Sequence, residues 1–236
     1  MPRPLHDGCS AMTIRDLASR GVGARLADGL ERFNRRHPWS HNDHFHAWIL
    51  ANLPARRRAA LDVGCGRGAL LEALAPRFET VQGIDIDGPM REVAARRCTG
   101  FENVTVDDQQ FGMIDGPFDL VTMVAVLHHL DLDEALVRAR EVLSPDGRLL
   151  VVGLAVPRTP RDLVWEAASI VTNPLIGLVK HPWADRENDG ADPFPVTNPR
   201  QTVDEIAEAA QRILPGAVVR RRLGFRYTLA WETPAA

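Results

Sequence analysis

The most informative part of this chain is Ala60-Leu61-Asp62-Val63-Gly64-Cys65-Gly66-Arg67-Gly68-Ala69-Leu70-Leu71. An apolar run that carries an acidic residue is followed by three alternating glycines and then by apolar residues at helical spacing. This order predicts a strand, a tight turn and a helix. Because glycine has no Cβ atom, the backbone can turn sharply there and a ligand can approach it closely. The pattern therefore indicates a ligand-binding turn.

A second acidic residue, Asp85, lies 21 positions after Gly64, at the end of the apolar run from Val81 to Ile84. A carboxylate in this place can accept hydrogen bonds from both hydroxyl groups of a ribose, as in nucleoside-binding βαβ units. We therefore predict a site for a nucleoside-containing cofactor.

The spacing of the turn does not by itself identify the cofactor, since Gly64, Gly66 and Ala69 also satisfy the loose pattern of dinucleotide-binding turns. The negative charge of Asp62, two residues before the first glycine, opposes a pyrophosphate and favours a cationic amino group. A ligand with a ribose, an adenine and a zwitterionic tail therefore fits the residues better than NAD.

From Ala60 to Val152 the sequence resembles the class I S-adenosylmethionine-dependent methyltransferases. The segments that are similar to the family's motifs, in the expected order, are residues 62–68, Asp85, residues 107–111, residues 118–130 and residues 143–152. The resemblance implies an α/β, Rossmann-like methyltransferase fold with helices on both faces of the sheet. In that fold a mostly parallel seven-stranded sheet carries an antiparallel C-terminal strand pair.

The resemblance also implies S-adenosylmethionine as the cofactor. Asp62 would face its methionine amino group, Asp85 its ribose hydroxyls, and Asp107 or Asp108 its adenine amino group. The glycine turn would hold the methionine end, and two apolar side chains after Asp85 would flank the adenine. The complete set of cofactor-binding residues expected from the resemblance is Asp62, Gly64, Cys65, Gly66, Gly68, Asp85, Ile86, Met90, Asp107, Asp108 and Val124.

Two histidines, His128 and His129, follow the predicted fourth strand, where the loop of this family faces the methyl group. Because imidazole takes up a proton near pH 7, we predict His128 as a catalytic general base. The alternative is that both histidines only pack against or cap the loop. A further group of histidines, from His37 to His46, lacks a pattern as specific as H-E-x-x-H, and we predict no metal site.

The order of the predicted elements divides the chain into four parts. We expect an N-terminal helical segment or lid over residues 1–55, a cofactor-binding βα core with five parallel strands over 56–154, a substrate-side insertion over 155–201, and a C-terminal helix and β-hairpin over 202–236 that complete the same domain. The helices expected outside the core are Trp39–Leu53 and Val203–Leu214, and the last two strands are Ala217–Leu223 and Phe225–Trp231.

The insertion leaves the fifth strand at the carboxyl edge of the sheet, where ligands bind in folds of this kind. Its apolar residues either line an acceptor pocket or only cover the sheet, and a pocket of this kind would take a small, partly apolar molecule. We predict methyl transfer from S-adenosylmethionine to such an acceptor by in-line displacement. The alternatives are a non-catalytic S-adenosylmethionine-binding regulatory protein and an NAD-dependent oxidoreductase.

Composition and charge favour a globular enzyme. The chain has 236 residues, 45% of them hydrophobic, and its formal net charge of -3 gives no electrostatic reason to expect nucleic-acid binding. Its 3 cysteines are far apart, and no apolar run reaches the ~18 residues of a membrane span. We therefore expect a cytoplasmic protein, a monomer or homodimer, that binds neither nucleic acid nor membranes.

Overall fold

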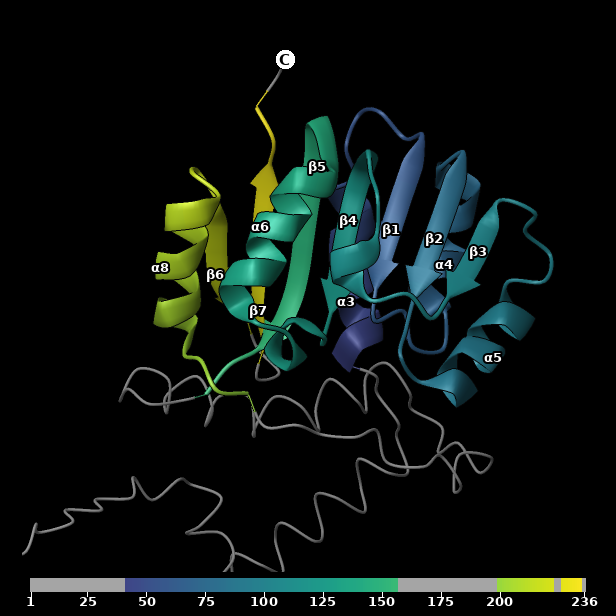
Figure 1. Ribbon diagram of the computed structural model, residues 1–236, viewed down its shortest axis with the longest axis horizontal. Coiled ribbons are helices and arrows are strands. Elements are labelled where there is room, and N and C mark those ends of the chain that lie inside the picture. Colours follow the sequence, from purple (N-terminus) through teal and green to yellow (C-terminus); the bar gives the residue numbers. More distant parts are fainter. Residues whose placement is uncertain (1–40, 157–198, 223–225, 235–236) are drawn as a thin grey trace, which may run out of the picture. The chain divides into compact units, whose positions relative to one another are not determined.

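The protein is built around a seven-stranded sheet whose strand order is β3-β2-β1-β4-β5-β7-β6 (Figure 1). The computed structural model describes residues 41–156, 199–222 and 226–234. The strands are β1 (Ala59–Val63), β2 (Thr80–Ile84), β3 (Val104–Asp107), β4 (Phe118–Val124), β5 (Leu143–Leu154), β6 (Val218–Arg222) and β7 (Arg226–Glu232). β1 to β5 pair in parallel, whereas β7 is antiparallel to both β5 and β6. The predicted sheet is confirmed.

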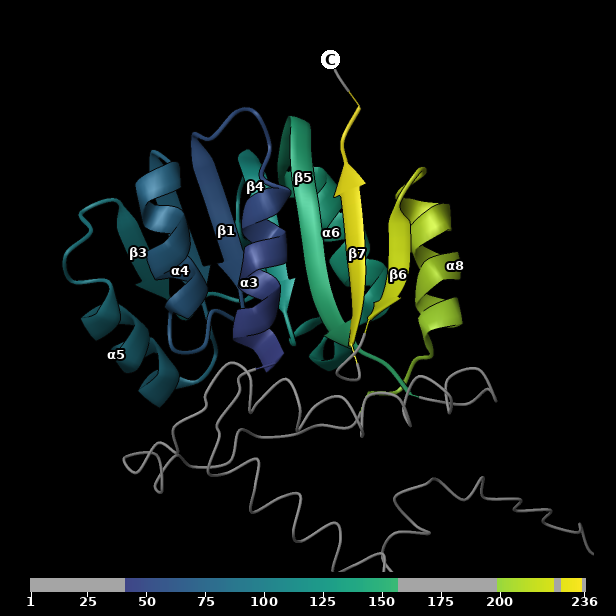
Figure 2. The same cartoon turned by 180° about the vertical axis from the view of Figure 1, so that it is seen from behind.

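Helices cover both faces of this sheet, as predicted (Figures 1 and 2). One face carries α3 (His41–Ala51), α4 (Ala69–Leu74) and α5 (Gly88–Arg97), and the other carries α6 (Leu132–Val142) and α8 (Val203–Ile213). Three short 3-10 helices complete the described elements: η1 (Ala75–Arg77), η2 (Phe111–Met113) and η3 (Leu127–His129). Among the residues described, none of the helices has the length and hydropathy needed to cross a bilayer.

The central strand β4 shows why the core has two sides. Its first six residues are buried, as expected for a parallel strand covered on both faces. Leu120 packs with Ile49 of α3 on one side, while Val121 and Met123 pack with Leu136 of α6 on the other. Because side chains alternate between the two faces of the sheet, β4 contributes residues to two separate apolar clusters.

The predicted helix boundaries are close to the observed ones. α8 ends one residue before the predicted end, and it begins with a capping box in which Thr202 and Glu205 bond to each other's backbone N–H groups. α3 ends at Ala51 rather than at Leu53, because Leu53 precedes Pro54 and the residue before a proline disfavours helical backbone. The predicted N-terminal segment before residue 41 and the insertion over 157–198 lie outside the described residues.

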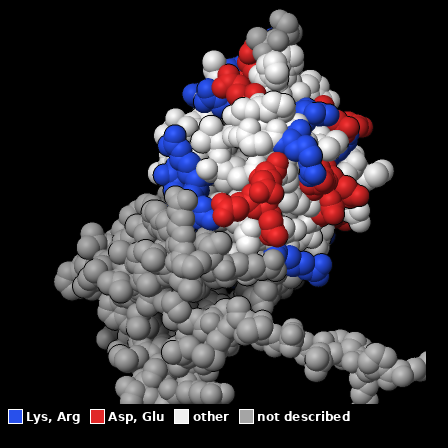
Figure 3. All heavy atoms as spheres, turned by 90° about the vertical axis from the view of Figure 1, so that its left-hand side faces the viewer, with Lys and Arg blue, Asp and Glu red and all other residues white. Residues whose placement is uncertain are grey.

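The side of the molecule formed by α8 and β6 carries acidic and basic side chains next to one another (Figure 3). Arg221 of β6 pairs with Asp204 of α8 at 3.1 Å, and Arg212 of α8 pairs with Asp133 of α6 at 2.6 Å. Both partners of the Arg212 pair are more than half exposed, so this pair adds little to stability.

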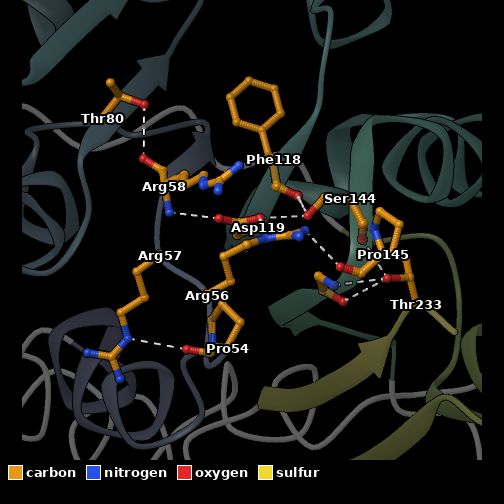
Figure 4. Close-up of polar contacts among 11 residues, drawn as sticks. Pro54, Arg56, Arg57, Arg58, Thr80, Phe118, Asp119, Ser144, Pro145 and Thr233 are labelled. Carbon is orange, nitrogen blue, oxygen red and sulfur yellow. Dashed lines mark hydrogen bonds and ion pairs between the residues drawn. The ribbon is translucent and has the colours of Figure 1, made fainter. Parts of the chain in front are cut away.

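A buried polar cluster joins the amino ends of β4 and β5 to the segment before β1 (Figure 4). Arg56 Nε, the backbone N–H of Arg58 and the Ser144 hydroxyl all donate to the Asp119 carboxylate, each at 2.7 Å. The hydroxyl of Thr233, beyond β7, donates to the Ser144 carbonyl oxygen at 2.6 Å. Burial raises the pKa of Asp119, but these hydrogen bonds and the Arg56 charge outweigh it and hold the pKa below its usual value.

Candidate active site

The candidate site lies at the edge of the sheet where β1, β2 and β4 end. Val63 at the end of β1 is opposite Ile84 of β2 and Met123 of β4, so the loops that follow these strands start side by side. The strand order also reverses between β1 and β4, since β2 and β3 lie on one side and β5 on the other. Ligands of open α/β sheets bind at such a switch point.

The glycine turn adopts the backbone that the sequence predicts. Gly64, Gly66 and Gly68 have φ values of 69, 52 and 75°, which lie in the left-handed region. A Cβ at Gly64 would lie 2.7 Å from Val126, and one at Gly68 would lie 2.9 Å from Ala94. Within the described ranges, a Cβ at Gly66 would meet no atom within 4 Å. Gly66 is therefore the glycine of this turn that faces open space, where a ligand can approach the backbone.

Cys65, also expected in the cofactor site, turns its side chain into the core. The residue is 7% exposed, and its Sγ lies 3.0 Å from the position that a Cβ of Gly83 would take. Burial, together with the nearby carboxylates, raises the pKa of the thiol. Cys65 therefore offers a ligand its backbone rather than its sulfur.

Asp85 is tied to the glycine turn by its own carboxylate. Its Oδ2 accepts from the Gly66 N–H at 2.8 Å, and its Oδ1 accepts from the Asp87 N–H at 2.9 Å. Asp87 in turn caps α5, accepting from the Met90 N–H at 3.0 Å. Between the two acids Ile86 is 85% exposed, which is unusual for a large apolar side chain. The end of β2 thus presents a fixed carboxylate beside an uncovered apolar surface.

Asp62 differs from Asp85 because it is almost completely buried, with 2% of its surface exposed. Its Oδ1 accepts a hydrogen bond of 2.7 Å from the hydroxyl of Thr122 on β4. Burial raises the pKa of Asp62 to about 7, and the neighbouring negative charge of Asp85 adds to this effect, while the Thr122 hydrogen bond opposes it. A cationic group beside these two acids would stabilise the ionised form of Asp62.

The two acids after β3 have different surroundings. The Asp107 carboxylate accepts from Nε2 of Gln82 at 3.0 Å, and the Asp107 carbonyl accepts from the Asp85 N–H at 3.1 Å. The side chain of Asp108 is 77% exposed and lies 3.8 Å from Nη2 of Arg91. Both acids start from the same loop beside Asp85, and either carboxylate has lone pairs left for a ligand.

The loop after β4 brings Val124 and His128 to the same edge. Val124 ends β4 and is half-buried, and Ala125 follows with a left-handed φ of 57°. The ring centroids of His128 and His129 are 4.0 Å apart. Burial, followed by the charges of His129 and Arg226, lowers the pKa of His128 to about 4, and its Nδ1 is buried with no hydrogen-bond partner in the described part of the chain. His128 is therefore neutral at physiological pH.

Sequence reasoning missed two residues of this site. Thr122 is a polar residue within an otherwise apolar strand, and that interruption was the available signal. Ala125 gave no signal, because alanine does not indicate a left-handed backbone. Across the described ranges, no three His, Cys, Asp or Glu side chains converge as metal ligands.

Comparison with known proteins identifies the family. A family model described as a methyltransferase domain matches residues 61–151. An uncharacterized methyltransferase of Mycobacterium tuberculosis is 34% identical over 203 residues, which cover 84% of this chain and 98% of the relative. Demethylmenaquinone methyltransferase of Tropheryma whipplei is 37% identical over 101 residues, 42% of each chain.

The fold comparison agrees with these relatives. The crystal structure of an S-adenosylmethionine-dependent methyltransferase from Aquifex aeolicus superimposes with a TM-score of 0.51 at 17% identity and covers 87% of this chain and 96% of that one. This likeness shows a shared fold, and the mycobacterial relative shows homology over nearly its full length. The chain therefore belongs to the methyltransferase family, and its fold is that of an S-adenosylmethionine-dependent methyltransferase.

Proposed function

We propose that the protein transfers the methyl group of S-adenosylmethionine to a small-molecule acceptor bound at the carboxyl edge of the sheet. The observation that carries the proposal is the link between the glycine turn and β2, in which the Gly66 N–H donates to Asp85 while the backbone of Gly66 faces open space. The negative charge of the nearby Asp85 disfavours the ionised form of Asp62. A nucleoside with a cationic tail relieves that repulsion, and a pyrophosphate would increase it.

The residues at the strand ends then take distinct roles. Asp62 binds the methionine amino group, the glycine turn offers its backbone to the methionine moiety, and Asp85 accepts from the ribose hydroxyls. The exposed side chain of Ile86, with Met90, packs against the adenine. The remaining members of the proposed set are Asp107 or Asp108 at the adenine amino group, Val124 at the end of β4, and the backbone of Cys65.

The protein's part in the chemistry is mainly alignment and exclusion of water. When bound, S-adenosylmethionine supplies a methyl group that its sulfonium already activates. The chain must therefore hold the acceptor atom in line and keep the site dry. Within the described site, we assign the positioning of the acceptor and the exclusion of water to the end of β4 and the loop after it, which carry Val124 and His128.

His128 serves as the proposed acceptor-side base. Its imidazole is neutral above about pH 5, because burial and the neighbouring positive charges lower its pKa to about 4. A neutral imidazole can accept a hydrogen bond from an acceptor hydroxyl or amine and take its proton as the new bond to the methyl carbon forms. Such a group orients the acceptor through its lone pair, but its lowered pKa makes it a weaker base than the imidazole of pKa near 7 on which the sequence prediction rested.

The acceptor is proposed to be small and partly apolar. The Tropheryma relative is named for demethylmenaquinone, and the sequence of the insertion over 155–201 is rich in apolar residues. A turnover assay tests this proposal. Protein mixed with S-adenosylmethionine labelled on its methyl group is offered phenols, hydroquinones, amines and carboxylic acids of matched size.

The assay has two contrasting results. Label transfer to one of these acceptor classes, with S-adenosylhomocysteine as co-product and loss of turnover in Asp85→Ala, supports the proposal. Tight S-adenosylmethionine binding without turnover for any acceptor would instead favour the non-catalytic regulatory alternative. The NAD-dependent alternative does not agree with the family to which the chain belongs.

A further inference from the structure

Thr122 connects β4 to the buried acid of the glycine turn. It lies opposite Asp62 in the parallel register of β1 and β4, and it is 0% exposed. Its hydroxyl oxygen is 2.7 Å from Oδ1 of Asp62 and 3.3 Å from the carbonyl oxygen of Leu61. Because a threonine hydroxyl has one proton and two lone pairs, it can donate to only one of these two acceptors at a time.

This arrangement satisfies both protonation states of Asp62. When the carboxylate is ionised, the Thr122 hydroxyl donates to it. When the carboxyl is protonated, it can donate to the Thr122 oxygen, which then turns its own proton to the Leu61 carbonyl. A buried polar group without a partner would be costly, so this exchange keeps both states accessible.

The surroundings of Asp62, as far as the structure describes them, leave its charge uncompensated. Within the described ranges, Asp85 is the charged group that acts on it, and it is also negative. Cys65 in the turn is the other titratable neighbour, and its thiol is neutral because its pKa is raised. α3 and α4, which cover this face of the sheet, contribute apolar side chains such as Ile49 and Leu71. A cationic ligand group would supply the positive charge that the described residues do not.

We propose that Thr122 is a positioning residue of the cofactor site, whose hydroxyl holds the Asp62 carboxyl group in either protonation state and so lets a cationic ligand group displace its proton. The inference rests on the proposed function, because it takes the ammonium group of the cofactor as the cation. As the ion pair forms, the proton passes from Asp62 to the buffer, and no covalent bond to carbon changes.

The test is calorimetric titration of Thr122→Val and Thr122→Ser with S-adenosylhomocysteine, which carries the ammonium group but no transferable methyl. Valine matches threonine in shape but cannot donate, so the pKa of Asp62 should rise by about one unit, a tenfold change in the ionised fraction. We expect Thr122→Val to bind about tenfold more weakly than wild type at pH 6, with the difference shrinking towards pH 9. Thr122→Ser should stay within about twofold at every pH, because it keeps the hydroxyl.

Two controls separate positioning from simple packing. 5′-Methylthioadenosine lacks the ammonium group and should bind wild type and Thr122→Val equally. Titrations at pH 7 in buffers of different ionisation heat measure the protons released on binding. Wild type should release about half a proton more per bound ligand than Asp62→Asn, and Thr122→Val should release more than wild type. Comparing proteins at one pH cancels the ligand's own titration.

Either of two results overturns the role of Thr122. One is equal affinity of Thr122→Val and wild type, and the other is a deficit that does not change with pH. If Thr122→Val fails to fold, equal proton release by wild type and Asp62→Asn overturns the inference instead. Failure of wild type to bind S-adenosylhomocysteine at all would contradict the proposed function itself, so the two failures can be distinguished.

Discussion

Gly66 differs from the other glycines of its turn because a Cβ there meets no atom of the described residues within 4 Å. Gly66→Ala should therefore fold, losing about 1–2 kcal/mol to the left-handed backbone. The added methyl group would occupy the space in which we place the cofactor, so S-adenosylmethionine affinity should fall at least about tenfold, or about 1.4 kcal/mol. Chemical denaturation and calorimetric titration measure the two effects.

Gly216 is a matched control for this substitution. It has a φ of 85°, and a Cβ there also meets no atom within 4 Å in the part of the chain that the structure describes, but it lies in the turn before β6. Gly216→Ala should lose similar stability and keep full cofactor affinity. Equal affinity losses in the two variants would show that Gly66 has no special place in the site.

We expect the buried Asp62 to lower the stability of the protein, although it contributes to cofactor binding. Its pKa of about 7 lies above the ordinary value of 3.8, so the folded state binds more protons than the unfolded state between these values. The contribution of this group to stability therefore falls as the pH rises from about 4 to 7. Asp62→Asn should raise the free energy of unfolding at pH 8 by about 2–4 kcal/mol, at ~1.4 kcal/mol per pKa unit.

The same variant should gain nothing at pH 4, where Asp62 is protonated in the folded protein, and it should bind S-adenosylmethionine weakly at any pH. Urea denaturation at the two pH values gives the comparison. A stability gain of the same size at pH 4 and pH 8 would be inconsistent with a buried charge at this position.

His128 and His129 form a natural pair for testing catalysis, because their rings are in contact but His129 is exposed. His128→Ala should lower kcat about 10²-fold or more and leave S-adenosylmethionine affinity unchanged. His129→Ala should change kcat less than His128→Ala does. Wild-type kcat/KM should show no inflection from His128 between pH 5 and 8, because its pKa is about 4. Full turnover in His128→Ala would show that His128 only packs against the loop and is not a catalytic base.

At the scale of elements, Asp119 joins three strand ends that are far apart in the sequence. Its lowered pKa means that its contribution to stability is present above the unfolded pKa of about 3.9 and is lost as the pH falls through the folded value. Asp119→Asn should cost about 1–3 kcal/mol at pH 7 by leaving buried donors poorly matched. That deficit should shrink as the pH falls below the unfolded pKa.

Asp133→Asn is the matched control, because Asp133 also pairs with an arginine but is 55% exposed. It should change the free energy of unfolding by less than about 0.5 kcal/mol. Comparable losses in the two variants would mean that the polar cluster of Asp119 is no more important than a surface ion pair.

The elements themselves were largely predictable because their signals are local. The alternating βα pattern predicted β1 to β5. The helix over Val203–Leu214 was predicted from the apolar spacing that α8 buries at Ile206, Ala209, Ala210 and Ile213. The predicted helix extends two residues beyond the end of α3. The apolar periodicity continues to Leu53, but Pro54 disfavours helical backbone at the residue before it.

At the scale of the whole molecule, the site depends on strands that meet only in the folded sheet. Position in the chain predicted that Asp85 lies at a strand end, and the family resemblance implied that Asp62 and Asp107 or Asp108 belong to the same site. The parallel sheet brings these strand ends together. The hydrogen bond between Thr122 and Asp62 spans 60 positions and follows from the register of β1 and β4. Patterns in a single sequence do not specify that register. The hydrogen bond from Thr122 to Asp62 was therefore not predicted.

The central claim is that the edge formed by β1, β2 and β4 binds S-adenosylmethionine through Asp85. The most direct measurement is parallel calorimetric titration of wild type and Asp85→Ala with S-adenosylmethionine, S-adenosylhomocysteine and NAD. We predict micromolar binding of the first two ligands, none of NAD, and a loss of ~1–3 kcal/mol in the folded variant, as expected for an abandoned hydrogen-bond pair. Binding of NAD alone, or unchanged affinity in Asp85→Ala, would contradict this account.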